Sequence, residues 1–167
     1  WIDDWRAEAA TDVSGVQTLV ARDGTHALSL SLQPAKPLVT HGAAGISRKG
    51  KEVGQASHYY SFTRLITKGT VTIDGESFDV TGTSWMDHEF GSGDLGADQV
   101  GWDWFSIQLE DNSELMLYRM RLKDGSSDLA SSGTIVFSDG RSRHMEVTEF
   151  QIESTGTWTS HDSKATY

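Results

Sequence analysis

The chain has 167 residues, of which 14 are Lys or Arg and 24 are Asp or Glu, so its formal net charge is −10. A surface this negative repels phosphate groups, which argues against a nucleic-acid partner. Hydrophobic residues make up 37% of the chain, as in a globular domain, and the absence of cysteine excludes disulfides and cysteine-based zinc sites. No apolar run reaches the ~18 residues of a membrane-spanning helix and no signal-peptide pattern occurs, so we expect no transmembrane segment.

Turn signals divide the chain into short segments. Asp-Gly pairs recur at 23–24, 74–75, 124–125 and 139–140. This pair favours the positive-φ positions of tight hairpin turns. Apolar and polar residues alternate in the segments that flank several of these turns. Short alternating segments at regular spacing predict an all-β fold, an antiparallel sandwich or barrel.

Two stretches depart from this pattern. Residues 5–10, with the sequence WRAEAA, have helical character and predict one short helix. Residues 34–54 contain both prolines, several glycines and a basic stretch, so we expect a long irregular connection. Such a segment is a solvated surface loop or a mobile lid over a pocket, and the residues leave both alternatives open.

The densest cluster of polar and aromatic residues lies within 82–91, where the sequence reads GTSWMDHEFG. Side chains alternate along a strand, so Trp85, Asp87 and Glu89 share one face while His88 points to the other. The two carboxylates then lie ~7 Å apart along the strand. On an inward face, burial and mutual repulsion would raise the pKa of one of them. A carboxylic acid of this kind beside a tryptophan can act as a general acid.

The same carboxylates have a structural interpretation. An arginine on a neighbouring strand could neutralise either of them, and Arg64, which shares a face with Tyr60, is the expected partner. Arg119 and Arg121 are further candidates. A metal site would need Asp87, His88 and Glu89 to converge through a bulge or to recruit His41 or His58. We therefore expect no metal.

Aromatic residues form a second cluster in the segment GWDWFS at 101–106. Trp102 and Trp104 share a strand face, with Asp103 between them on the other. Such a stripe serves either as core packing or as the wall of a site for an apolar ligand. Phosphate-binding loops, dinucleotide fingerprints and the Gly-x-Ser-x-Gly elbow are absent, so we expect no cofactor.

Several segments resemble the carotenoid 1,2-hydratase family, also called hydroxyneurosporene synthase or the AttH-like family. They are YYSFTRL at 59–65, WMDHEFGS at 85–92, QVGWDWF at 99–105, ELMLYR at 114–119 and GTWTS at 156–160. The resemblance implies a protein of two tandem lipocalin-like β-barrels in the periplasm, the envelope or the medium. Residues 1–155 would form the N-terminal domain, and 156–167 would begin the connection to a second β-barrel domain absent from this chain.

The resemblance also implies a chemistry. An acid protonates a trisubstituted alkene, a tertiary carbocation forms beside aromatic faces, and water adds to it. Asp87 would be the acid, Glu89 would orient the water or form an ion pair, and His88 is the third candidate catalytic residue. The expected partner is a small apolar ligand. The candidate ligand-binding residues are Tyr59, Tyr60, Arg64, Trp85, Trp102, Trp104 and Tyr118.

Two other functions fit the same residues. One is a non-catalytic, lipocalin-like lipid-binding module of the bacterial envelope. The other is an esterase-type secreted hydrolase, which needs a serine beside a histidine. Ser84 faces the same side as His88, so it is the serine to check.

Overall fold

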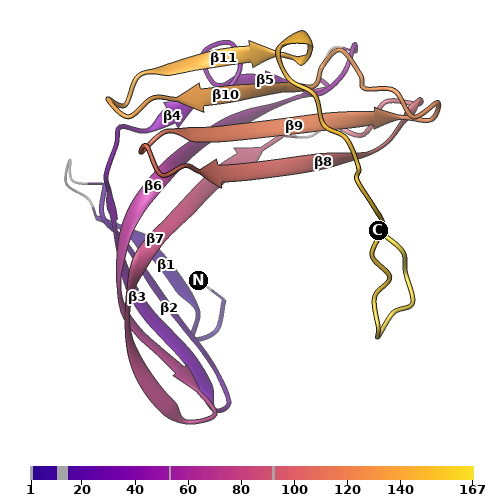
Figure 1. Ribbon diagram of the computed structural model, residues 1–167. Coiled ribbons are helices and arrows are strands. Elements are labelled where there is room, and N and C mark those ends of the chain that lie inside the picture. The colour runs from indigo at the N-terminus through magenta and orange to yellow at the C-terminus, as the bar shows by residue number, and fades with distance from the viewer. Residues whose placement is uncertain (1, 11–14, 53, 92) are drawn as a thin grey trace.

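The computed structural model describes residues 2–10, 15–52, 54–91 and 93–167. They form two antiparallel β-sheets (Figure 1). The first sheet contains β1 (Arg6–Ala9), β2 (Gln17–Asp23), β3 (His26–Pro34), β4 (Val39–Thr40), β5 (Ile46–Arg48), β6 (Ala56–Ile73) and β7 (Glu76–Phe90). The second contains β8 (Gln99–Gln108), β9 (Glu114–Leu122), β10 (Ser132–Val136) and β11 (Ser142–Glu146), and the short 3-10 helix η1 (Val147–Glu149) follows.

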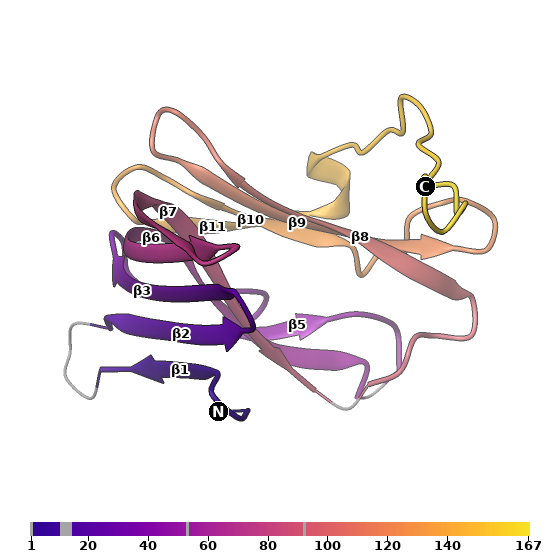
Figure 2. The same cartoon turned by 90° about the horizontal axis from the view of Figure 1, so that it is seen from below.

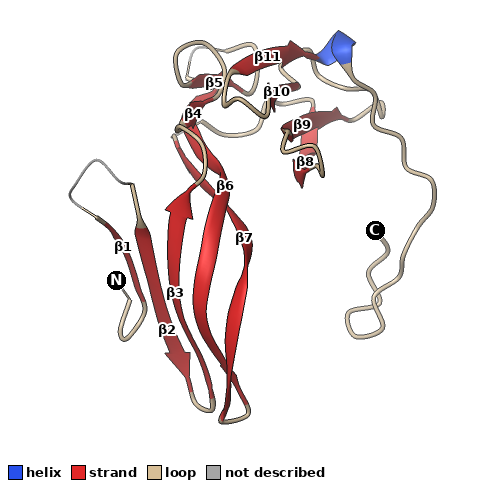
Figure 3. Ribbon diagram, turned by 60° about the vertical axis from the view of Figure 1, so that its left-hand side comes forward, coloured by secondary structure: helices blue, strands red, loops and turns tan. Residues whose placement is uncertain are grey.

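Strand β6 organises the first sheet. One of its edges pairs in turn with β5, β4 and β3, and its other edge pairs with β7 along almost its whole length. The register between β6 and β7 shifts between Phe62 and Leu65, which marks a bulge. Beyond the bulge, β6 and β7 continue with β1, β2 and β3 as an arm that extends away from the second sheet (Figure 3).

The second sheet lies over the end of the first sheet that carries β4 and β5 (Figures 1 and 2). The core between them contains Tyr59 from β6 and Met116, Tyr118 and Met120 from β9, with Trp85 packed against them. Alternation along β9 explains this choice, because residues 116, 118 and 120 fall on one strand face. The face of β6 and β7 that meets the second sheet is therefore the face that carries the candidate site.

The predicted fold class is confirmed, since nearly all regular structure is antiparallel strand. The described strands form two sheets and no closed barrel. The glycine of each Asp-Gly pair has a positive φ, as the turns require. Three of these pairs join β2 to β3, β6 to β7 and β10 to β11.

Two local predictions need correction. The helix predicted over residues 5–10 is wrong, because Arg6–Ala9 forms strand β1 and pairs with β2. Hydrogen bonds to a neighbouring strand outweigh the weak helical preference of this stretch. The connection at 34–54 is less irregular than expected, since it contains β4 and β5. No helix in the described part of the chain is long and apolar enough to cross a bilayer.

Candidate functional site

Three donors converge on one carboxylate oxygen of Asp87. The hydroxyl of Tyr59 donates to Oδ1 over 3.0 Å and the indole Nε1 of Trp85 donates over 2.9 Å. The hydroxyl of Ser61 donates to the same oxygen. Local geometry explains the arrangement, because Ser61 lies directly opposite Asp87 in the β6–β7 register. Tyr59 and Trp85 are each two positions away on the same sheet face.

A chain of hydrogen bonds lies behind the serine. The imidazole Nε2 of His41 is 2.8 Å from Oγ of Ser61, and its Nδ1 is 2.9 Å from Oγ1 of Thr134 on β10. The single hydroxyl hydrogen of Ser61 goes to Asp87, so Nε2 of His41 carries a hydrogen and donates it to Ser61. Nδ1 of His41 then accepts from Thr134. Each hydrogen bond in the series from Thr134 through His41 and Ser61 donates toward Asp87, so these hydrogen bonds polarise one another.

A second, shorter chain passes through Tyr59. The indole Nε1 of Trp104 on β8 donates to the Tyr59 hydroxyl over 3.0 Å, and that hydroxyl donates to Asp87. Burial, followed by the nearby charge of Asp87, raises the pKa of the Tyr59 phenol. Tyr59 is therefore a donor at every physiological pH. The carboxylate on the first sheet is thus connected to residues on β8 and β10 of the second.

His41 is held in place by its backbone. Its amide donates to the carbonyl of Tyr59 over 3.0 Å. The chain then turns at Gly42, whose φ is +70°, and a Cβ at this position would lie 2.2 Å from the carbonyl oxygen of Ile46. Only glycine fits such a close approach. The imidazole is 4.2 Å from the ring of Tyr59, measured between centroids.

The buried imidazole makes the protein sensitive to acid. Burial, helped by the positive charge of Lys49, lowers the pKa of His41 from 6.5 to about 4. Between these pH values His41 binds a proton in the unfolded chain but not in the folded protein. The free energy of unfolding therefore falls as the pH decreases. We expect a loss of about 3 kcal/mol from this group across the window. Urea unfolding curves recorded at several pH values measure it.

A His41→Gln variant should have a flatter dependence between pH 6.5 and pH 4. His26→Gln is the matched control for the loss of a histidine, because that side chain is 60% exposed. An unchanged slope in the His41 variant would show that another group binds the proton.

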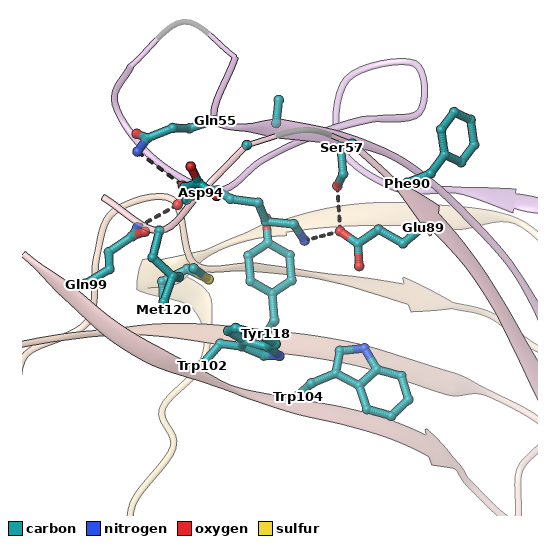
Figure 4. A pocket seen from close by; sticks show the side chains of 15 residues that line it. Gln55, Ser57, Glu89, Phe90, Asp94, Gln99, Trp102, Trp104, Tyr118 and Met120 are labelled. Carbon is teal, nitrogen blue, oxygen red and sulfur yellow. Dashed lines mark hydrogen bonds and ion pairs between the residues drawn. The ribbon is translucent and has the colours of Figure 1, made fainter. Parts of the chain in front are cut away.

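A pocket of about 280 Å³ adjoins the Asp87 site and shares Trp104 with it. Trp102 and Trp104 project from β8 along one side, while Glu89 lies across from them (Figure 4). The indoles remain 58% and 42% exposed, which is too much for core residues, so they form a wall. Lys49 also lines the pocket, with its Nζ 2.9 Å from Oε1 of Glu89.

The structure brings together some of the predicted site residues and separates others. Asp87, Tyr59, Trp85 and Trp104 form the hydrogen-bonded cluster, and Glu89, Trp102 and Tyr118 line the adjoining pocket. His88 and Tyr60 lie elsewhere, because their rings stack at 4.9 Å on the opposite side of β6 and β7.

The expected pairing of Arg64 with Asp87 or Glu89 is wrong. Nε of Arg64 is 2.6 Å from Oε1 of Glu114. Glu89 pairs instead with Lys49, and no arginine within the described ranges contacts Asp87. The other candidate partners are also engaged elsewhere. Nε of Arg121 is 3.4 Å from Oδ1 of Asp103, and Nη2 of Arg119 donates to the carbonyl of Gly125.

A serine does lie beside a histidine, but the geometry is not that of a hydrolase. Ser84 bonds to Thr67 over 2.7 Å, while the Ser61 hydroxyl is the one near His41. Ser61 is fully buried, and Nδ1 of His41 faces a threonine where a catalytic triad places a carboxylate. Nor does the described chain contain a cluster of three or more His, Asp or Glu residues that could hold a metal ion.

Sequence reasoning missed four residues as members of this hydrogen-bonded site: His41, Lys49, Ser61 and Thr134. It named His41 only as a possible metal ligand. Ser61 alone had a signal, because alternation places it on the same strand face as Tyr59. The other three reach the site from β10 and from the connection at 34–54. No local pattern in the sequence marks them.

Comparisons with known proteins agree with the fold. A family model described as AttH-like matches residues 1–167. The crystal structure of an AttH protein from Nitrosomonas europaea has a TM-score of 0.89 and 34% identity, covering 98% of this chain and 50% of that one. The crystal structure of kievitone hydratase from Nectria haematococca has a TM-score of 0.66 and 15% identity, covering 96% of this chain and 52% of that one.

The chain thus spans about half the length of both solved proteins. At 15% identity, the likeness to kievitone hydratase shows a common fold and no more. No curated protein matches the chain. The family model nevertheless covers every residue, and the resemblance seen in the segments around Tyr59, Asp87 and Trp102 is confirmed: the chain belongs to the AttH-like family.

Proposed function

We propose that the Asp87 site adds water to a carbon–carbon double bond of an apolar, isoprenoid-like substrate held against Trp102 and Trp104. The observation that carries this proposal is the convergence of three donors on Oδ1 of Asp87 beside an aromatic-walled pocket. In the described part of the chain, Oδ2 has no hydrogen-bond partner. It is the oxygen that can carry and deliver a proton.

The donors suit the charge that this step creates. When the carboxyl protonates the alkene, a negative charge develops on Asp87 and a positive charge on the substrate carbon. Donors already aimed at Oδ1 stabilise the carboxylate as it forms, without reorganisation at that moment. The faces of Trp102 and Trp104 can stabilise the carbocation. Water then adds to the cation, and Asp87 recovers its proton from the added water.

One comparison with a solved structure supports the proposal. The fold resembles that of a protein named kievitone hydratase, and this chain covers about half of that protein. In our proposal a second β domain, reached through residues 156–167, covers the remaining side of the pocket. A periplasmic or envelope location is what the family resemblance implies.

The test is to incubate the protein with kievitone and with acyclic isoprenoid alkenes in water labelled with ¹⁸O. We expect an alcohol product that carries one heavy oxygen, detected by mass spectrometry and absent without protein. Binding without product would favour the non-catalytic lipid-binding module, for which the two exposed indoles are the supporting observation. Cleavage of ester substrates would favour the hydrolase instead.

A further inference from the structure

The pocket beside Asp87 has a polar edge as well as an aromatic wall. Trp102 and Trp104 lie on one side, and Ser57 and Glu89 lie across from them (Figure 4). Lys49 joins this edge through its ion pair with Glu89, and the two side chains are 23% and 36% exposed. A charged pair therefore stands within reach of any ligand that stacks on the indoles.

Among the described residues, Glu89 is the one hydrogen-bonding partner of the Lys49 ammonium, which therefore retains capacity for a further hydrogen bond. Its ammonium group carries three N–H donors. One points to Oε1 of Glu89, and the ammonium lies 3.7 Å from the centroid of the Tyr118 ring and 5.2 Å from that of Tyr59. The aromatic faces hold the charge but do not accept as a carbonyl or hydroxyl oxygen does.

Glu89 has matching capacity as an acceptor. Its Oε1 accepts from Lys49 and from the hydroxyl of Ser57. Its Oε2 has no hydrogen-bond partner in the part of the chain that the structure describes. As far as the described residues show, the pocket edge thus presents one unpaired donor and one unpaired acceptor side by side.

The chemistry of this pair discriminates among ligands. A pure hydrocarbon would displace water from Lys49 and Glu89 without forming a hydrogen bond to either. This desolvation costs binding free energy. A carboxylate would be attracted by Lys49 but repelled by Glu89. A hydroxyl group can accept from Lys49 and donate to Glu89 at the same time, so it satisfies both.

We propose that the Lys49–Glu89 pair recognises a hydroxyl group, alcoholic or phenolic, on the apolar ligand. The substrate class is then a hydroxylated isoprenoid-like alkene and not a hydrocarbon. This inference rests on the proposed function for the alkene, but its test measures binding alone. A protein that binds in the expected order without turnover would therefore overturn the proposed function and leave this inference standing.

The test uses three ligands with related carbon skeletons: geraniol, its carboxylate geranate, and the hydrocarbon myrcene. Isothermal titration calorimetry of the parent protein should show geraniol binding about tenfold more tightly than either of the others. Lys49→Met should remove this advantage by weakening the binding of geraniol, while the affinity for myrcene should not fall, because the hydrocarbon forms no hydrogen bond with Lys49. Lys51→Met is the matched control, because Lys51 does not line this pocket, and it should alter none of the three affinities.

A second variant should bind geranate more tightly than the parent protein, and misfolding could not produce such a gain in affinity. Glu89→Gln removes the repelling charge and frees Lys49, so geranate should bind on the order of tenfold more tightly than to the parent protein. Equal affinities for geraniol and myrcene in the parent protein would overturn the proposal. So would a failure of all three ligands to bind, or a Glu89→Gln protein that discriminates against geranate as strongly as the parent does.

Discussion

Replacing Asp87 by asparagine should lower the rate of hydration by about 10²–10⁴-fold, the range expected for loss of a general acid. The amide oxygen can still accept from Tyr59, Ser61 and Trp85, but the amide nitrogen has no acidic proton to deliver. No arginine of the described chain contacts Asp87, so the change leaves no buried cation unpaired. The melting temperature and the ligand affinity should therefore stay close to those of the parent protein.

Initial rates of labelled product and a thermal unfolding curve measure the two parts of this expectation. Asp103→Asn is the matched control, because Asp103 pairs with Arg121 and makes no bond to the Asp87 cluster. It should leave the rate within a factor of about two, since partly exposed ion pairs contribute little. An Asp87→Asn protein that hydrates its substrate at the parent rate would contradict the proposed role.

Glu114→Gln should destabilise the fold by about 3–5 kcal/mol. The Glu114 side chain is fully buried and accepts from Nζ of Lys36 at 2.7 Å and from Nε of Arg64 at 2.6 Å. These cations are themselves only 7% and 13% exposed. An uncharged amide would leave both of them buried without a counter-ion, in the place where β9 of the second sheet meets the first.

Urea unfolding curves measure the loss. Asp139→Asn provides the surface control, because it removes an exposed ion pair with Arg141 and should cost far less stability than the change at Glu114. Replacing Lys36 and Arg64 by methionine and Glu114 by leucine together should recover much of the stability, because no unpaired charge remains. A Glu114→Gln protein as stable as the surface control would show that Glu114, Lys36 and Arg64 are solvated in the folded state.

Local features of the sequence predicted local features of the fold. Asp74-Gly75 gave its hairpin because the turn type depends on these two residues alone. Alternation placed Trp85 and Asp87 on one face, and the structure joins them by a hydrogen bond. The helix predicted at residues 5–10 was wrong because the alternative structure, a strand paired with β2, depends on residues outside this segment.

Arg64 shows why the partners of the site residues were harder to predict. Strict alternation places Thr63 and Arg64 on opposite faces, yet both contact the carboxylate of Glu114. The register between β6 and β7 shifts at this point, between Phe62 and Leu65. No residue pattern marks this irregularity, and the partner of Arg64 was predicted from charge alone, without knowledge of which strand lies beside it. His41 was missed for a similar reason, since a turn at Gly42 and a contact with β10 position its ring.

The bulge in β6 also bears on how members of the family can diverge. Pairing between β6 and β7 on the side of Asp87 is set separately from pairing in the arm, because the register is interrupted between them. Shortening the arm hairpin at Asp74-Gly75 by matched pairs of residues would leave every side chain near Asp87 on its present face. Deletion of the single residue between Tyr59 and Ser61 would place these two side chains on opposite faces, so only one of them could still contact Asp87. Length variation among relatives should therefore accumulate in the arm, while the segment before the bulge keeps its residue count.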